Sequence, residues 1–250
     1  MIDIHTHILP CVDDGAKTVE ESVEMLQKLQ KQGVTEVALT PHYYGKRYSA
    51  KQFLEKRNAS FAQIQNFIPE GIKVRLGAEV ALSGVNDPRD EALCALAIEG
   101  TKCVLVELPF YSRWSNSLFN RIADFVSETD YLPIVAHIER YKTALKHPET
   151  VARLVDMGCL IQLNVRAFRD KKTKRFAYAL LKHGLVHCLG TDAHDLKHRP
   201  PEYADIKAEV ENAGYVSEWY EAQTRMKNAV RGELVDRRYT PVKKLFRCYL

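Results

Sequence analysis

Short apolar runs alternate with longer amphipathic stretches along almost the whole chain. Seven runs have the length and composition of buried strands: residues 2–8, 36–41, 73–80, 103–108, 132–137, 159–164 and 186–191. Helical spacing of apolar residues recurs in residues 50–67, 88–98, 115–128, 148–157, 171–183 and 202–212. The alternation predicts parallel α/β architecture, either an eight-fold-like barrel or a doubly wound sheet, and seven strands favour a distorted seven-stranded (β/α) barrel.

Another helix is predicted between the first two strands. Thr18 and Glu21 have the spacing of a capping box, in which each side chain bonds the backbone N–H of the other residue. Apolar residues follow at helical spacing, and Gly33 is typical of the position just beyond a helix end.

The 250 residues are enough for one large core, and we expect a single domain over residues 1–250. No internal repeat, low-complexity segment or Pro/Gly/Ser-rich linker divides the sequence. The last stretch, at about residues 240–250, is basic and apolar. It is expected either to pack on the barrel or to fray.

Composition excludes several classes of protein. Thirty-six Lys and Arg against 32 Asp and Glu leave a formal charge of +4, too small and scattered to indicate nucleic-acid binding. No apolar run approaches the roughly 20 residues that span a bilayer, and the N-terminus does not resemble a signal peptide. Six cysteines without a C-x-x-C pair indicate reduced thiols, so a cytoplasmic location is expected.

Histidine and acidic side chains gather where the predicted strands end. His5 and His7 stand two apart and therefore project from one face. The complete set of candidate metal ligands is His5, His7, Asp14, His42, Glu79, Glu107, His137, Asp192 and His194. In parallel barrels the C-terminal strand ends and their loops form the active site, so these side chains are expected on one rim.

Imidazole and carboxylate groups together suit Mn, Fe or Zn, and the absence of thiolates from the set argues against a structural cysteine-type zinc site. Buried charge on one rim would be costly unless it were paired or neutralised by cations. Nine ligands are too many for one tetrahedral ion and suit two or three ions. Clustered dications suit hydrolysis of phosphate esters, because they activate water and neutralise the attacking and leaving oxygens.

Two arginines follow the last ligand-bearing strands. Arg140 lies three residues after His137, and Arg199 lies in the loop after His194. A guanidinium group binds phosphate bidentately, so both are candidate catalytic residues; each could instead pair with a nearby acid, Glu139 or Asp195. The other histidines, His147, His183, His187 and His198, are interpreted as ordinary structural residues.

Several motifs together resemble the polymerase and histidinol phosphatase (PHP) superfamily. These are Asp3-Ile4-His5-Thr6-His7, Val12-Asp13-Asp14-Gly15, Thr40-Pro41-His42, Ala136-His137-Ile138-Glu139-Arg140 and Thr191-Asp192-Ala193-His194. More narrowly, the chain resembles the manganese-dependent protein-tyrosine phosphatases of capsular and exopolysaccharide loci in Gram-positive bacteria. The resemblance runs from Ile2 to about Pro201 and implies a barrel of the PHP type.

The resemblance also implies three metal positions and a role for both arginines. The first position would use His5, His7, Glu79 and Asp192, the second Glu79, Glu107 and His137, and the third Asp14, His42 and His194. Arg140 and Arg199 match the arginines that hold phosphate in the family. A metal-activated hydroxide would attack phosphorus, and the substrate would be phosphotyrosine on the tyrosine kinase that regulates polysaccharide synthesis.

Two departures from the family pattern concern substrate preference. Tyr43-Tyr44-Gly45-Lys46 follows His42, where other members often carry more basic or His-rich sequence, and Asp195 stands where an Asn is expected. The two tyrosines could stack on a phosphotyrosine ring or simply cover the mouth of the barrel.

Other functions are weighed against this interpretation. A cysteine-dependent phosphatase is disfavoured, because no cysteine is followed by an Arg six positions later, and no P-loop or G-x-G-x-x-G motif is present. A small-molecule phosphatase, such as one acting on histidinol phosphate, remains the main alternative. An amidohydrolase would need a bridging Lys at a strand end, which we do not find. A scaffold that docks on the kinase through the basic tail would require a vestigial metal set.

Overall fold

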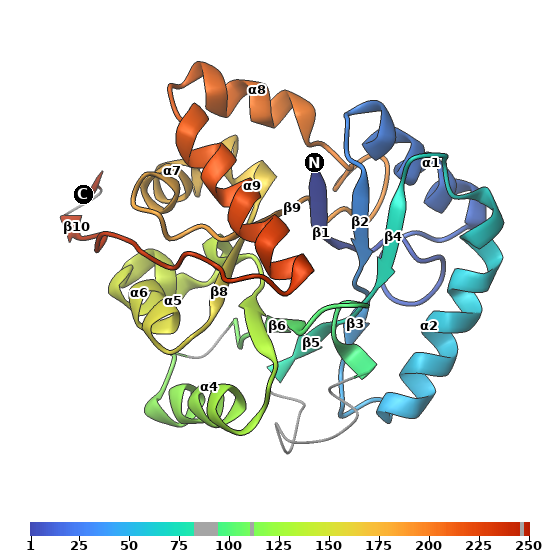
Figure 1. Cartoon of the computed structure of the whole chain (residues 1–250), viewed down its shortest axis with the longest axis horizontal. Coiled ribbons are helices and arrows are strands. Elements are labelled where there is room, and N and C mark those ends of the chain that lie inside the picture. Colours follow the sequence, from blue (N-terminus) through green and yellow to red (C-terminus); the bar gives the residue numbers. More distant parts are fainter. Residues whose placement is uncertain (83–94, 111–112, 246–247) are drawn as a thin grey trace.

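In the computed structural model, which describes residues 1–82, 95–110, 113–245 and 248–250, a curled parallel sheet is surrounded by helices (Figure 1). One ladder joins β1 (Ile2–Thr6), β2 (Glu36–Leu39) and β4 (Lys73–Leu76). The other runs in the order β3 (His42–Tyr43), β5 (Glu79–Ala81), β6 (Cys103–Glu107), β7 (Leu132–Val135), β8 (Leu160–Asn164) and β9 (Cys188–Gly190). Every neighbouring pair in both ladders is parallel, which confirms the predicted α/β class.

Two of the predicted strands end earlier than expected, and a further short strand follows each of them. The strand predicted for residues 36–41 ends at Leu39, and β3 begins beyond it at His42. The strand predicted for residues 73–80 is interrupted after Leu76, and β5 begins at Glu79. At the first break Pro41 has no N–H to donate to a ladder. At the second, a Cβ on Gly77 would lie 3.2 Å from Cγ2 of Thr40, so the two bends pack closely. His42 and Glu79 therefore begin β3 and β5, rather than ending the strands before them.

Backbone hydrogen bonds also connect the first strand with the segment after the last parallel strand. The N–H of Asp192 donates to the carbonyl oxygen of His5, and the N–H of His7 donates to that of Ala193, each over 2.8 Å. Gly190 permits this approach, because a Cβ there would lie 2.8 Å from Cβ of His5. The ladders themselves remain two separate sets, so the predicted distorted seven-stranded barrel is not confirmed.

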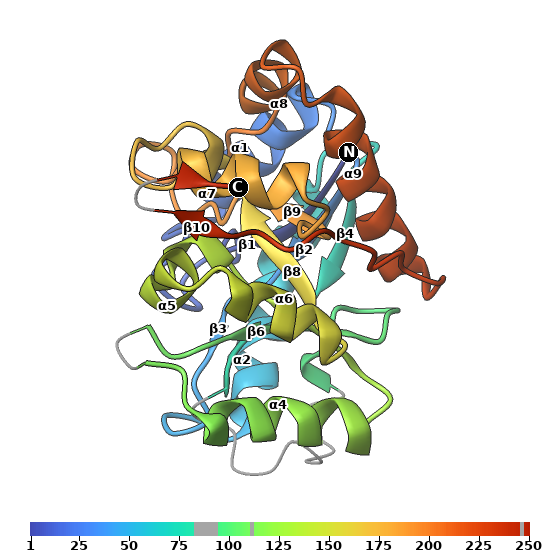
Figure 2. The ribbon, with the colours of Figure 1, turned by 90° about the vertical axis from the view of Figure 1, so that its left-hand side faces the viewer.

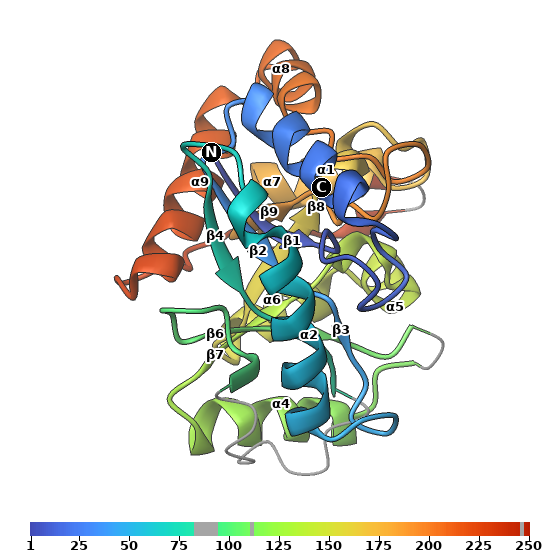
Figure 3. The same cartoon turned by 90° about the vertical axis from the view of Figure 1, so that its right-hand side faces the viewer.

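Most predicted helices are present with slightly different ends. They are α1 (Val19–Lys31), α2 (Ala50–Ile64) with η1 (Gln65–Phe67), α4 (Asn116–Glu128), α6 (Glu149–Asp156), α7 (Lys174–Lys182) and α8 (Ala204–Asn212). Figure 3 shows α1 and α2 together on one flank of the sheet. The helix predicted for residues 88–98 lies mostly outside the described residues. No helix of the described ranges combines the length and apolar character needed to cross a bilayer.

Two helices were missed by the sequence analysis. The short α5 (Lys142–Lys146) follows the 3₁₀ turn η3 (Ile138–Arg140), and α9 (Val216–Arg231) packs against β9. The buried face of α9 includes Trp219, Ala222 and Met226, but Glu, Gln, Lys and Arg residues between them dilute the apolar pattern. Gly232 then ends the helix with a φ of 70°.

The predicted capping box of α1 is only half formed. The side chain of Thr18 accepts a hydrogen bond from the N–H of Glu21 over 3.1 Å, as expected. The carboxylate of Glu21, however, accepts from the N–H of Lys17 instead of Thr18. A complete capping box is found instead at Ser49 and Gln52, at the start of α2.

The C-terminal stretch packs on the body of the protein. Strands β10 (Lys244–Leu245) and β11 (Cys248–Tyr249) pair antiparallel beside α5 and α7 (Figure 2). The hydroxyl of Tyr249 donates to the carbonyl oxygen of Leu145 over 2.8 Å, and its ring lies 5.1 Å from that of Phe176. Of the two expectations for the tail, packing is the correct one.

Candidate metal centre

The nine predicted ligands converge in the structure, because each has a side-chain nitrogen or oxygen within 3.6 Å of another member. They come from seven segments that are far apart in the sequence. His5 lies in β1, Glu107 ends β6, and His137 follows β7 by two residues. Asp192 and His194 follow β9, and Asp14 lies in the loop before α1. Parallel pairing of the strands places these segments side by side.

Glu79 lies at the centre of the cluster. Its Oε2 atom is 3.2 Å from Nε2 of His5, 3.3 Å from Nε2 of His7 and 2.9 Å from Nδ1 of His42. Its Oε1 atom is 2.7 Å from Nε2 of His137. Burial alone would raise the pKa of this carboxyl, but the histidines, His5 and His137 foremost, hold it well below its usual range. One carboxylate thus contacts four imidazoles, as expected of a group that bridges cations.

Three of the donor atoms, on His5, His7 and Asp192, are spaced like the ligands of a single ion. Nε2 of His5 and Nε2 of His7 are 3.0 Å apart, and Oδ1 of Asp192 lies 3.5 Å and 3.3 Å from them. With ligand distances of about 2.1 Å, the edge of a tetrahedral site is roughly 3.4 Å. Oδ1 of Asp192 and Oε2 of Glu79 are buried and have no hydrogen-bond partner, so both remain available to a cation.

Two further groups of donors adjoin this one. Ligand atoms of His42, Glu79 and Glu107 lie within 4.8 Å of one another, as do those of His7, Asp14, His42 and His194. Nδ1 of His42 and Nε2 of His194 are buried without a hydrogen-bond partner. The side chain of Asp14 is 66% exposed, so this end of the centre opens to solvent. The mixture of imidazole and carboxylate donors fits Mn, Fe or Zn.

Asp13, which we did not select from the sequence, orients two of the ligands. Its Oδ2 atom lies 2.6 Å from Nδ1 of His7 and accepts the N–H of His42 over 2.8 Å. A carboxylate on Nδ1 leaves Nε2 of His7 free to bind a cation. Gly15 allows the loop to close on His7, because a Cβ at Gly15 would lie 2.0 Å from the His7 carbonyl oxygen.

Two amide side chains on β8 were also missed. Oε1 of Gln162 lies 3.2 Å from Nδ1 of His5 and accepts the N–H of His137 over 2.5 Å. Its Nε2 donates to Oδ1 of Asn164, whose Nδ2 donates to Oδ2 of Asp192 over 2.9 Å. Both amides therefore hold ligand-bearing segments in place. Their sequence signal was available, since two polar residues alternate within an otherwise apolar strand.

Two of the candidate metal ligands have strained backbone conformations. His137 has a φ of 32° and Asp192 a φ of 54°, in the left-handed region that residues other than glycine rarely adopt. Such conformations cost of the order of 1–3 kcal/mol and persist where surrounding contacts impose them, commonly at functional sites. The bonds from His137 N–H to Gln162 and from Asp192 N–H to His5 are contacts of this kind.

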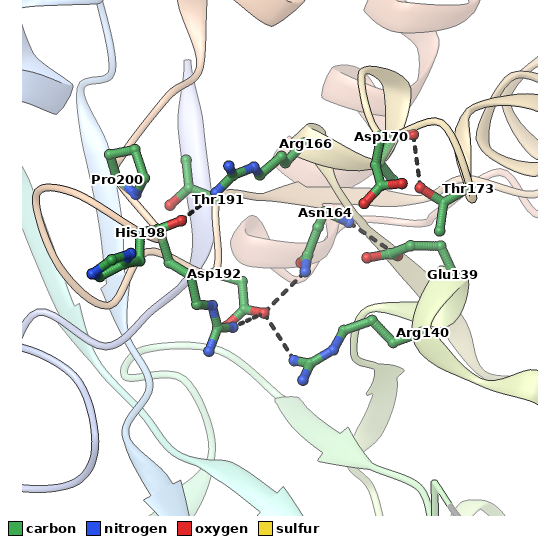
Figure 4. Close-up of a pocket in the computed structure, with 12 residues that line it drawn as sticks. Glu139, Arg140, Asn164, Arg166, Asp170, Thr173, Thr191, Asp192, His198 and Pro200 are labelled. Atoms are coloured by element: carbon green, nitrogen blue, oxygen red, sulfur yellow. Dashed lines mark hydrogen bonds and ion pairs between the residues drawn. The ribbon is translucent and has the colours of Figure 1, made fainter.

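Arg140 and Arg199 both contact the side chain of Asp192. Nη1 of Arg140 lies 3.2 Å from Oδ2 of Asp192, and Nη2 of Arg199 forms a close ion pair with the same oxygen. The alternative pairings with Glu139 and Asp195 do not form among the described residues. Asp195 instead accepts the backbone N–H groups of residues 197–199 and shapes the loop that carries Arg199. A pocket of about 470 Å³ opens beside these groups (Figure 4).

The two tyrosines that follow His42 have different environments. Tyr43 is buried, and its ring lies 5.2 Å from that of Phe53 in the core. Tyr44 is half-buried and stacks on His42, with ring centroids 5.2 Å apart. On the other side of the centre, Phe110 stacks on His137 at 5.3 Å. Tyr44 therefore has its ring against one of the candidate ligands, whereas the ring of Tyr43 packs on Phe53 in the core.

The four remaining histidines have other surroundings. His147 pairs with Glu149 at the surface, and Nδ1 of His183 lies 2.8 Å from the hydroxyl of Thr240. His187 is buried, with Nδ1 accepting the N–H of Ile161 over 3.3 Å. His198 lines the pocket next to the centre. None of them joins the groups of candidate ligands found in the described ranges.

A curled parallel sheet that gathers imidazoles, carboxylates and two arginines at one site defines a metal-dependent hydrolase of the α/β class. The chain belongs to the CpsB/CapC family of capsular polysaccharide synthesis, whose family model matches residues 1–231. This membership confirms the resemblance seen in the sequence.

Named relatives are tyrosine phosphatases. The chain is 30% identical over 206 residues to the tyrosine-protein phosphatase YwqE of Bacillus subtilis (strain 168), which covers 80% of this chain and 79% of that protein. It is 30% identical over 216 residues to the tyrosine-protein phosphatase CpsB of Streptococcus agalactiae serotype III (strain NEM316), covering 82% and 87%.

Solved structures agree with the sequence relatives. A crystal structure from work on YwqE of Bacillus subtilis and CpsB of Streptococcus pneumoniae, described as metal-dependent tyrosine phosphatases, matches with a TM-score of 0.79 and 27% identity. The match covers 98% of this chain and 100% of that one. A phosphotriesterase homology protein from Escherichia coli, at a TM-score of 0.55 and 14% identity, shows a similar fold only.

Proposed function

We propose that this protein is a metal-dependent protein-tyrosine phosphatase that hydrolyses phosphotyrosine on the tyrosine kinase regulating capsular or exopolysaccharide synthesis. The observation that carries the proposal is the buried Oε2 atom of Glu79, which has no hydrogen-bond partner yet lies within 3.3 Å of three imidazoles. Two arginines and an open pocket lie beside that cluster, and this arrangement suits the binding of a phosphate monoester. Family membership and the named relatives support the same activity.

Three divalent ions, preferably manganese, are proposed to occupy the centre. His5, His7, Glu79 and Asp192 would hold the first, Glu79, Glu107 and His137 the second, and Asp14, His42 and His194 the third. Bound ions would activate water and neutralise charge on the phosphate oxygens. The unpartnered atoms of Glu79, Asp192, His42 and His194 support this assignment.

Arg140 and Arg199 would hold the phosphate group. Each guanidinium group now lies on Oδ2 of Asp192 and could turn toward a phosphate that enters the adjoining pocket. Asn164 would then remain as the donor to this oxygen and keep the Asp192 side chain in place. A half-buried Tyr44 ring stacked on His42 would form an apolar wall for the aromatic part of the substrate.

The proposal extends to the whole chain. One domain over residues 1–250 would contain a distorted seven-stranded barrel. The backbone hydrogen bonds between β1 and the segment after β9 would close this barrel. The free thiols of Cys103, Cys159 and Cys188, all buried, support a reducing cytoplasmic location.

The test is an elemental analysis combined with metal add-back. Protein stripped with a chelator should lose hydrolysis of a phosphotyrosine peptide and recover it best with manganese. The same preparation should act more slowly on histidinol phosphate and other small phosphate monoesters; the reverse order would favour the small-molecule phosphatase. Full activity in excess chelator would defeat the proposal. A variant outside the centre, His183→Ala, is the matched control and should respond to metal as the unchanged chain does.

A further inference from the structure

The pocket next to the metal centre contains a third arginine that the proposed chemistry does not use. Arg140 and Arg199 line it and both contact Asp192. Arg166 reaches in from η4 (Val165–Phe168), near His198 and Thr191 (Figure 4). The pocket has a volume of about 470 Å³. It therefore has room for more than a phosphate group held by two arginines.

The guanidinium group of Arg166 is fixed by a hydrogen bond, but its charge is not balanced by an ion pair among the described residues. Its Nη1 atom donates to the carbonyl oxygen of His198 over 2.5 Å, and the side chain is exposed. In the portion of the chain that the structure describes, no carboxylate lies within ion-pair distance of it. Arg169, three residues later, is different, because it pairs with Glu202 and Glu209 outside the pocket. The remaining donors of Arg166 are available to a ligand.

The acidic residues of the pocket do not offset this charge. Asp192 is shared by Arg140 and Arg199, and the buried Glu139 accepts the N–H of Asn164 over 3.3 Å. Asp170 is exposed, with one oxygen accepting the N–H of Lys172. Three guanidinium groups thus surround a pocket in which Asp170 alone is an exposed carboxylate, so the site favours a ligand with a second anionic group.

We propose that Arg166 forms an anion-binding subsite that takes a carboxylate side chain flanking the phosphotyrosine, so that acidic phosphopeptides are the preferred substrates. The proposal rests on the proposed function, since it places the phosphate on Arg140 and Arg199. A guanidinium group binds a carboxylate through two parallel hydrogen bonds, and its position beside the phosphate site matches a residue close in sequence to the phosphotyrosine. Arg166 is then a specificity determinant and takes no part in the chemical step.

The test compares two phosphotyrosine peptides that differ only in having Glu or Gln on both sides of the phosphotyrosine. The manganese-loaded protein should hydrolyse the Glu peptide with a kcat/KM about tenfold higher, mainly through a lower KM. Arg166→Gln should bring the ratio close to one, and Arg166→Lys should give an intermediate ratio. Arg169→Gln, the matched control, should retain the ratio of the unchanged chain.

Other outcomes would overturn the subsite. Equal hydrolysis of both peptides by the unchanged chain would do so, as would an undiminished preference in Arg166→Gln. An equal loss on both peptides and on p-nitrophenyl phosphate, with the preference intact, would mean that Arg166 only supports the loop of His198 and Arg199. If neither peptide nor p-nitrophenyl phosphate were hydrolysed by the manganese-loaded protein, the proposed function itself would fail.

Discussion

Nδ2 of Asn164 donates a hydrogen bond of 2.9 Å to Oδ2 of Asp192, the same oxygen that Arg140 and Arg199 contact. Three donors therefore hold one oxygen of this carboxylate, while Oδ1 remains buried and unpartnered on the side of the metal centre. The two strands that bring them together, β8 and β9, pair so that Asn164 is opposite Gly190, two residues before Asp192. The relationship makes Asn164 a positioning residue for a candidate metal ligand.

Removal of this bond is expected to weaken metal binding. Asn164→Leu keeps a similar volume but leaves Oδ2 of Asp192 without its amide donor. Loss of such supporting contacts typically lowers metal affinity by roughly 10–100-fold. Titration calorimetry with manganese would measure the change, and Asn120→Leu on the exposed face of α4 is the control. Unchanged affinity in Asn164→Leu would show that the bond does not position Asp192.

Glu79 should couple metal binding to thermal stability. Because ions bind the folded centre and not the dispersed ligands of the unfolded chain, manganese at 1,000 times its Kd should stabilise the fold by about 4 kcal/mol. Glu79→Gln removes the carboxylate that contacts four imidazoles and should abolish most of the manganese-induced rise in Tm. Scanning fluorimetry with and without manganese gives the result. Glu149→Gln, at the surface, should retain the full rise.

Arg199 should affect turnover far more than metal content. Its guanidinium group lies beside the centre without supplying a metal ligand, so Arg199→Ala should retain manganese. We expect its kcat/KM on a phosphotyrosine peptide to fall by roughly 10²–10³, as when another preorganised donor to developing charge is removed. Arg140→Ala should behave similarly, and Arg169→Ala serves as the control. Rates near those of the unchanged chain in both variants would contradict the assignment.

His187 should make the fold sensitive to acid. Burial, together with Arg225 and Arg237, lowers the pKa of its imidazole to about 3. In the unfolded chain the group titrates near 6.5, so between these values the unfolded state binds more protons. The stability contributed by neutral His187 is complete above about pH 6.5 and is lost as the pH falls, by about 2 kcal/mol at pH 5.

Replacement with asparagine tests this pH dependence. The side-chain oxygen of His187→Asn can take the place of Nδ1 as acceptor for the N–H of Ile161, and it does not titrate. Urea unfolding of chelated protein at pH 7 and pH 5 should show a smaller loss of stability in this variant than in the unchanged chain. His147→Asn, which is exposed, should follow the unchanged chain. Equal losses in all three proteins would refute the role of His187.

Sequence periodicity predicted most of the strands and helices in their order, and the strand ends predicted where the candidate ligands would lie. Strand and helix periods are local properties, and ligands placed after successive parallel strands must meet at one edge. This is why His5, Glu107, His137 and Asp192 could be selected before their contacts were known. α9 was missed because its buried face is diluted by charged residues along the same turns.

Only the tertiary structure decided which groups meet within the centre. After β2 and β4 the chain bends, and Thr40 packs closely against Gly77 at these bends. Both arginines pair with Asp192, a contact between segments that are far apart in the sequence. Asp13, Gln162 and Asn164 act through bonds to residues far away in the chain. The sequence shows which side chains are present and roughly where along each strand they lie. The distances between them, and the partners for which they compete, are set only when the strands pair in the folded protein.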